Sequence, residues 1–397
     1  MLALLGWQAL PGYSVLTHEA IIDMVWDTSV KPLLLKRFPD LTPEQLREAH
    51  AYAYGGAIIQ DMGYYPFGSK FFSDLAHYVR SGDFVAALLR DSQDSYEYAF
   101  ALGALAHYAA DNAGHSIAVN RAVPLLYPKL ARKYGPAVTY EDDPAAHLKT
   151  EFGFDVVQVA NAKYAPESYH DFIGFSVSKP VLERAFEDTY GMKLKDVFKS
   201  LDLALGTYRR TVSSILPEMT KAAWAAKKKE ILKLQPGITR KKFLYNLNRA
   251  SYVKEWGQGY EKPGPGARFL AFLFRLVPKV GPFRTLAFRP PTAEAEKLFI
   301  ASFDDTLERY RRLLAEVGED RLQLVNTNFD TGQPTREGKY RLADQSYAEL
   351  LEKLADAKTA VSSELRQDIL AFYRDPGTIK SEKARGEYES LLGNSTK

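Results

Sequence analysis

Apolar residues recur at spacings of three and four along most of this 397-residue chain, and sustained alternation of apolar and polar residues is rare. A spacing of three and four places apolar side chains on one face of a helix, whereas alternation would indicate a strand. The pattern therefore predicts an all-α, multi-helical fold. The expected helices cover residues 17–37, 42–59, 69–80, 95–113, 144–162, 180–190, 197–232, 293–316 and 342–373.

The clearest helix boundary is the segment Thr-Pro-Glu-Gln at residues 42–45. Thr42 suits the cap position, proline suits the first helical position, and Gln45 stands where its side chain can reach back to the cap. Clusters of proline and glycine predict loops at 260–266 and 278–291, and residues 326–339 read as a long polar loop.

Cysteine is absent from the sequence. This excludes disulfides, thiolate zinc sites, iron–sulfur clusters and a cysteine nucleophile, so that any metal must be bound by histidine, carboxylate or backbone groups. The net charge of +3 conceals an asymmetry, because residues 221–290 hold sixteen basic and three acidic residues, a local +13. The remainder of the chain is therefore acidic, at −10, and the molecule as a whole is no general polyanion binder.

Histidine and carboxylate residues are paired at helical spacing. His107 and Asp111 are four residues apart, as are His147 and Glu151, so each pair projects from one face of an expected helix. His115 follows one turn after Asp111. Three more candidates lie in other segments: His18, Asp61 and His77.

A single pair of this kind is usually an ordinary surface pair, but several together are harder to explain in that way. Asp111 lies on an apolar helix, where an unpaired carboxylate costs several kcal/mol unless it is hydrogen-bonded or bound to a metal. The set therefore indicates a metal site of nitrogen and oxygen ligands, which suits zinc but also admits manganese or iron. His50 and His170 fall outside the pattern, and we expect structural or surface roles for them.

The order of these residues, with the phrase ALGALAHYAADNAGH and the later His-x-x-x-Glu, resembles the zinc-dependent phospholipase C family, whose fold is shared by zinc nucleases specific for single strands. The resemblance covers roughly residues 13–160, with a weaker extension to about 220. It implies an all-helical domain that holds zinc ions in a cleft. It also implies three sets of zinc ligands. The first zinc is bound by Asp61, His77, His107 and Asp111, and the second by Asp111, His18 and the amino and carbonyl groups of Tyr13. The third is bound by His115, His147 and Glu151.

The same resemblance bears on the N-terminus. Family members often begin their mature chain with a tryptophan five residues before the first histidine, and Tyr13 holds that position before His18. We therefore expect residues 1–12 to be the remnant of a signal segment and the protein to be exported. A packed N-terminal segment is the alternative reading. A second difference is that three residues separate Asp111 from His115, where the family usually has five.

These features predict three parts: the segment 1–12, a catalytic domain at 13–235, and a basic and hydrophobic segment with a helical extension at 236–397. The expected activity is a phospholipase C reaction on a phospholipid with two to three zinc ions. The resemblance implies that Asp61 orients or deprotonates the attacking water. Two alternatives remain, a single-strand nuclease and a metal-stabilised module without activity.

The choice of lipid over nucleic acid depends on residues 266–290. In this segment Phe and Leu residues are flanked by Arg and Lys, as in an element that lies on an anionic lipid surface. Nucleic-acid binding is the less favoured partner, because the segment is richer in aliphatic residues than base stacking requires. A hydrophobic hairpin packed on the core is the alternative to membrane contact.

Overall fold

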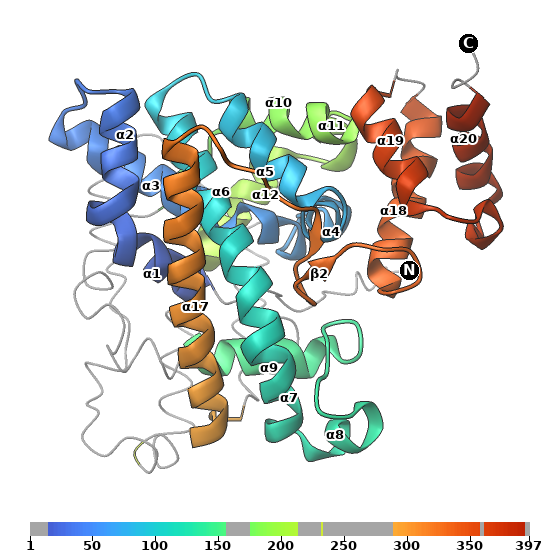
Figure 1. Ribbon diagram of the computed structural model, residues 1–397, viewed down its shortest axis with the longest axis horizontal. Helices are drawn as coiled ribbons and strands as arrows, with labels where there is room; N and C mark the ends of the chain where they lie inside the picture. The colour runs from blue at the N-terminus through green and yellow to red at the C-terminus, as the bar shows by residue number, and fades with distance from the viewer. Residues whose placement is uncertain (1–14, 156–174, 213–231, 233–288, 358–360, 394–397) are drawn as a thin grey trace, which may run out of the picture.

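The computed structural model describes residues 15–155, 175–212, 232, 289–357 and 361–393 (Figure 1). In these ranges almost every element is a helix, and the two strands are two residues long, which confirms the expected all-α class. The elements are α1 (Val15–Val25), η1 (Trp26–Val30), α2 (Lys31–Arg37), α3 (Pro43–Ile58), η2 (Ile59–Tyr64), α4 (Lys70–Tyr78), α5 (Ser81–Arg90), α6 (Ser95–Ala113), η3 (Gly114–Val119), α7 (Asn120–Leu126), α8 (Pro128–Tyr134), α9 (Pro144–Phe154), α10 (Lys179–Tyr190), α11 (Leu194–Val197), α12 (Leu201–Arg210), α17 (Ala293–Gly318), β1 (Thr327–Asn328), β2 (Gln333–Pro334), α18 (Arg341–Ala357), α19 (Ser363–Phe372), η8 (Pro376–Thr378) and α20 (Glu382–Gly393).

Several helix boundaries follow the local sequence. The hydroxyl of Thr42 accepts a hydrogen bond from the Gln45 N–H at 3.2 Å, and the Thr42 N–H donates to the Gln45 side chain at 2.9 Å. This reciprocal capping box confirms the predicted start of α3. Helix α6 has the predicted bounds, and the side chain of Asp94 caps it by accepting from two backbone N–H groups.

Other boundaries differ from the prediction. The single helix expected over 342–373 is wrong, because α18 ends at Ala357 and α19 begins after the capping residue Ser362. The helix expected over 197–232 is interrupted within its described part, since α11 ends at Val197 and Ser200 caps α12. Helices α5, α7, α8 and α20 were not anticipated from the periodicity.

Helices α3 and α6 form the centre of the fold and touch backbone to backbone. A Cβ atom added to Gly56 would lie 1.8 Å from the Phe100 carbonyl oxygen, and one added to Gly103 would lie 2.0 Å from the Ala53 carbonyl oxygen. Only glycine permits this approach, because any larger side chain would occupy the space of the opposing backbone. The close crossing sets the position of the second half of α6, which carries His107 and Asp111.

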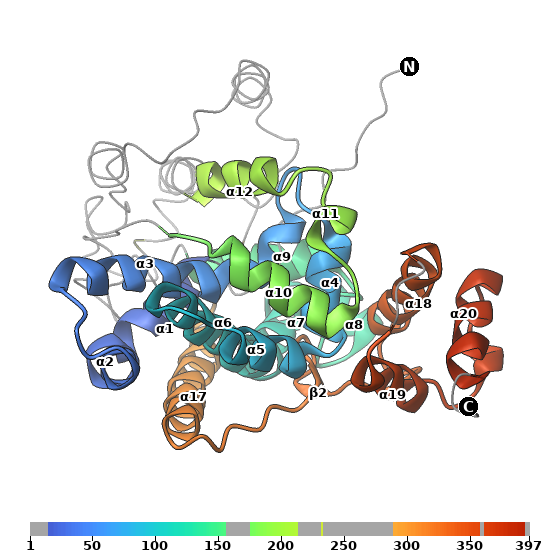
Figure 2. The same cartoon turned by 90° about the horizontal axis from the view of Figure 1, so that it is seen from above.

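The later part of the chain packs on the earlier helices. Helix α17 lies beside α6 and contacts α7 and α1, while α18, α19 and α20 gather at one end of the molecule (Figures 1 and 2). The Tyr310 hydroxyl of α17 donates to the Leu102 carbonyl at 2.9 Å, and the rings of Phe299 and Phe154 stack with centroids 4.8 Å apart. Among the described residues, we find no helix that is both long and apolar enough to span a bilayer.

One partly buried carboxylate at this end yields a stability prediction. The Tyr347 hydroxyl donates to Asp368 at 2.8 Å, but burial outweighs this bond and the nearby Arg80 and raises the pKa of Asp368 to about 6. The folded protein holds the proton of this carboxyl more tightly than the unfolded chain does, so the group stabilises the fold below its unfolded pKa near 4. That contribution is lost as the pH rises through the folded pKa of about 6.

We therefore expect Asp368→Asn, which keeps an acceptor for Tyr347, to raise the unfolding free energy at pH 7 by about 1–2 kcal/mol after allowance for solvent screening. The gain should vanish near pH 4. Urea unfolding at both pH values measures it, with the exposed Glu389→Gln as the control. A variant less stable than wild type at pH 7 would contradict the prediction.

Candidate metal centre

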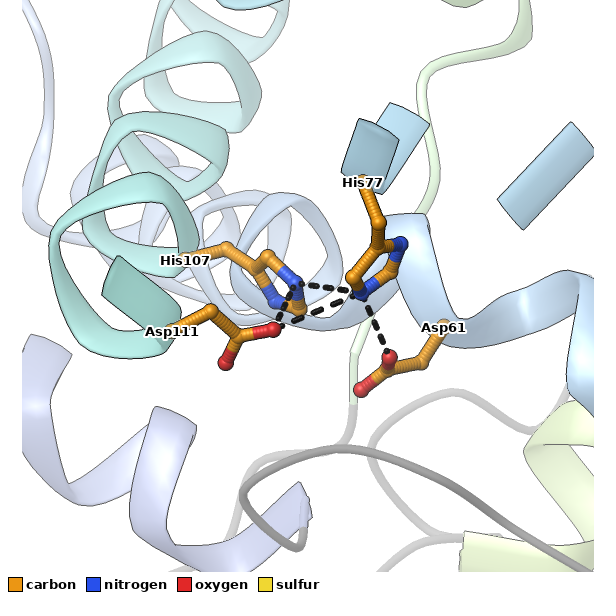
Figure 3. Close-up of side chains that lie close together, drawn as sticks. All are labelled: Asp61, His77, His107 and Asp111. Carbon is orange, nitrogen blue, oxygen red and sulfur yellow. Dashed lines mark hydrogen bonds and ion pairs between the residues drawn. The ribbon is translucent and has the colours of Figure 1, made fainter. Parts of the chain in front are cut away.

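Four side chains from three elements converge at the first cluster: Asp61 on η2, His77 on α4, and His107 and Asp111 on α6 (Figure 3). Asp111 Oδ2 lies 3.1 Å from His107 Nε2 and 3.3 Å from His77 Nε2. His77 Nε2 lies 3.3 Å from Asp61 Oδ1 and 3.4 Å from His107 Nε2. Ligands of a tetrahedral zinc at about 2.0–2.1 Å stand roughly 3.3 Å from one another, so these separations have the size of one zinc shell.

Backbone contacts aim both imidazoles at the cluster. His107 Nδ1 lies 2.9 Å from the Ala57 carbonyl oxygen on α3, and His77 Nδ1 lies 2.7 Å from the Ser73 carbonyl oxygen. A carbonyl oxygen only accepts, so each Nδ1 carries a proton and each Nε2 is the nitrogen that faces the cluster. This is the arrangement in which metal-bound histidines are usually held.

His18 of α1 lies on the opposite side of Asp111. Its Nε2 is 3.4 Å from Asp111 Oδ1, and its ring stacks on His107 with centroids 4.4 Å apart. One oxygen of Asp111 thus faces His18 and the other faces His77 and His107, as in a carboxylate that bridges two ions. Tyr13, the other residue expected near His18, lies outside the described residues.

The second cluster comprises His115 of η3 with His147 and Glu151 of α9. His147 Nε2 lies 2.8 Å from Glu151 Oε1 and 3.0 Å from His115 Nδ1. His115 Nε2 lies 3.6 Å from Asp111 Oδ2, which joins the two clusters. The shortened spacing between Asp111 and His115 coincides with a π-helical turn, Gly114–Val119, which continues α6.

The buried carboxylates provide a test of whether a metal fits. Both oxygens of Asp111 and of Glu151 are buried, and within the described chain no N–H or O–H group reaches them with hydrogen-bond geometry. Buried carboxylates without such donors are costly unless a cation neutralises them. The donor set contains only imidazole nitrogen and carboxylate oxygen, which are the ligands that zinc accepts in the absence of thiolate.

The electrostatics of the cluster favour a cation. Burial disfavours a charged imidazole at His77, yet Asp111 and Asp61 raise its pKa to about 9. Burial likewise opposes ionisation of Asp111, but His107 and His115 hold the pKa of this carboxyl well below its usual range. The carboxylates thus attract protons to the imidazoles when no metal is present, and a bound metal would displace those protons.

Asp330, from the expected polar loop, is a site residue that the sequence did not reveal. It is 2 % exposed, and its Oδ1 lies 3.1 Å from His115 Nδ1 and 3.9 Å from His147 Nε2. Burial opposes ionisation of Asp330, but His115 and His147 lower its pKa to about 2. The residue is 215 positions from His115 along the chain, so no helical spacing connects it with the histidines.

Its neighbour Phe329 covers the first cluster. The Phe329 ring packs against His77 and His107 with centroids 5.4 and 5.9 Å away, and its N–H donates to the His77 carbonyl at 3.1 Å. His50 has the structural role that we expected, since it stacks on Trp26 at 3.9 Å and contacts Asp23 at 2.9 Å. His170 lies outside the described residues.

Comparison with protein families gives a match for residues 17–200, to the family described as zinc dependent phospholipase C. Residues 17–200, slightly less than half of the chain, are thus similar to the zinc-dependent phospholipase C family. No curated protein and no solved structure matches the chain. The matched segment contains all the residues of both clusters and His18, whereas Asp330 lies beyond its end.

Proposed function

We propose that the protein is a zinc-dependent phosphodiester hydrolase of the phospholipase C type, which cleaves the glycerol–phosphate bond of a phospholipid. The observation that carries the proposal is the first cluster, where two imidazoles and two carboxylates are all buried and neighbouring ligand atoms lie 3.1–3.4 Å apart. The family match over residues 17–200 supports the same reaction class.

The proposed ligands follow the two clusters. The first zinc is bound by Asp61, His77, His107 and Asp111, and a further zinc by His115, His147 and Glu151. Asp111 and His18, with the N-terminal groups of Tyr13, would hold one more, which gives two to three ions in total. Bound zinc lowers the pKa of a coordinated water towards about 7 and stabilises negative charge on phosphate oxygens.

Asp61 is the proposed catalytic residue, which orients the attacking water and accepts its proton. Its Oδ1 is 3.3 Å from His77 Nε2, and Figure 3 shows its other oxygen turned away from His77. A carboxylate at the edge of the cluster can therefore contact both the metal shell and a water beside it. Phe329 and the aromatic ring of Tyr64, 5.6 Å from His77, limit the access of bulk water.

The lipid substrate, export of the protein and the membrane-facing role of residues 266–290 are parts of this proposal. Those residues, like 1–14, lie outside the described part of the chain. The proposal is tested by measuring zinc content and by parallel assays on phosphatidylcholine vesicles and single-stranded DNA. Release of diacylglycerol and a phosphorylated head group supports it, whereas cleavage of DNA alone would make the protein a nuclease.

A variant separates the role of Asp61 from metal binding alone. We expect Asp61→Asn to lower kcat by about 10²–10⁴-fold, the range for loss of a general base, with a smaller change in KM. The control is Asp23→Asn, at a partly buried carboxylate that contacts His50 and Tyr54 outside both clusters. Unchanged kcat in Asp61→Asn with full zinc content would remove Asp61 from the mechanism.

A further inference from the structure

Residues 324–335, here called the strap, run from the end of α17 across the metal centre. The Tyr108 hydroxyl of α6 donates to the Val325 carbonyl at 2.9 Å. Ser81 of α5 donates to the Thr327 carbonyl at 2.6 Å and accepts from the Thr327 N–H at 3.1 Å. The strap is therefore attached to two helices of the family segment before it reaches the second cluster.

Hydrogen bonds hold both the side chain and the backbone of Asp330 in place. Its Oδ2 accepts from the Tyr140 N–H at 2.9 Å and from the Tyr340 hydroxyl at 2.6 Å. Its own N–H donates to Asn328 Oδ1 at 2.9 Å, and its carbonyl accepts from Asn120 at 2.7 Å. With the backbone and Oδ2 held in this way, Oδ1 is the atom that faces the second cluster.

The contact between Oδ1 and His115 Nδ1, at 3.1 Å, determines the tautomer of His115. A carboxylate can only accept, so Nδ1 carries a proton and Nε2 is the nitrogen that a metal can bind once it displaces any proton there. That Nε2 faces Asp111 Oδ2 at 3.6 Å and Glu151 Oε1 at 3.9 Å, between the two clusters.

We propose that Asp330 is a positioning residue of the metal centre, which orients His115 and fixes the tautomer that leaves Nε2 available to a metal. The inference rests on the proposed function in one respect, that zinc occupies the second cluster. Carboxylates that hold a metal-bound histidine in this way typically change metal affinity by about 10–100-fold when mutated. The centre is therefore completed by a residue from outside the segment that matches the family.

The variant Asp330→Asn tests this positioning role, because the donors around the side chain determine how an asparagine amide would be oriented. The Tyr140 N–H is a fixed backbone donor, so the asparagine carbonyl should turn towards it and the amide NH₂ towards His115. An amide donor would force Nδ1 to accept and would place the proton on Nε2. We expect zinc affinity at the second cluster to fall by about 10–100-fold, measured by titration against a chelator.

Two further variants separate orientation from simple structural support. Asp330→Ala removes three contacts and leaves both tautomers of His115 accessible, so zinc binding should be weakened less than in Asp330→Asn. A merely structural role predicts the reverse order, because asparagine preserves the shape of the side chain. Tyr340→Phe removes one donor from Oδ2 and should leave zinc affinity close to that of wild type.

The tautomer itself is read from ¹⁵N-labelled histidine by two-bond NMR correlation in zinc-loaded protein, where the metal has displaced the second proton of each bound imidazole. Wild type should show His115 protonated at Nδ1, and this result does not depend on whether any variant folds. Protonation at Nε2 in wild type, or equal zinc affinity in Asp330→Asn, would overturn the inference. Wild-type protein that binds no zinc would instead overturn the proposed function, so the two failures are distinguishable.

Discussion

Asp111→Asn is expected to lower phosphodiester hydrolysis by on the order of 10³-fold, because loss of one metal removes about 4 kcal/mol of charge stabilisation. The reason is the position of this carboxylate: Oδ1 faces His18 at 3.4 Å, and Oδ2 faces His107 at 3.1 Å and His77 at 3.3 Å. Zinc content measured by elemental analysis should fall together with activity.

His115→Ala provides the comparison for this variant. It removes a ligand from one cluster only, so we expect a smaller loss of activity and of zinc than in Asp111→Asn. Asn112→Ala is the control on the same helix, since the Asn112 side chain turns back to the Tyr108 carbonyl at 2.8 Å. Wild-type zinc content and activity in Asp111→Asn would exclude a bridging role for this carboxylate.

Gly103→Ala is expected to destabilise the protein by about 3–5 kcal/mol, or to prevent folding, because the new Cβ overlaps a backbone rather than a movable side chain. The Cβ atom would lie 2.0 Å from the Ala53 carbonyl oxygen, so α3 and α6 must move apart. That movement would also break the contact of His107 Nδ1 with the Ala57 carbonyl, and metal binding should weaken in any protein that folds.

Gly206→Ala is the matched control for Gly103→Ala. Gly206 lies inside α12, and a Cβ there meets no atom of the described residues within 4 Å. Since alanine is the better helix former, this change should raise the unfolding free energy by about 0.5–1 kcal/mol. Thermal and urea unfolding of both variants measure the difference, and equal stability of the two would show that the helices tolerate separation.

The sequence predicted the parts of the candidate site in which two residues lie one helical turn apart, because that spacing alone brings their side chains together. The pairs His107/Asp111 and His147/Glu151 are each four residues apart, and each pair does lie close together, at 3.1 and 2.8 Å. The sequence also grouped them with His18, Asp61 and His77 through a resemblance to a family, since no spacing connects residues on separate helices. Their roles as metal ligands stay a prediction.

Asp330 could not be anticipated, because the residues that give it a role come from distant parts of the chain. Its partners are His115, Tyr140 and Tyr340, and two of the three lie about 200 positions away. The local sequence NFDTG indicates a turn and nothing more. The same applies to α5, whose start depends on Arg80, with a φ of 49°, held by Asp83 and by the Thr189 carbonyl.

The sequence by itself determined the all-α class, the bounds of α6, the capping box of α3 and the nitrogen and oxygen donors available to a metal. These properties depend on residues within about four positions of one another, which local periodicity and capping describe. Only the tertiary structure decided that glycine lets α3 and α6 touch, that Asp111 stands between His18 and His107, and that the strap delivers Asp330 to His115. The physical reason is that a tautomer or a shared carboxylate is set by atoms within about 3–4 Å in space, whatever their distance along the chain.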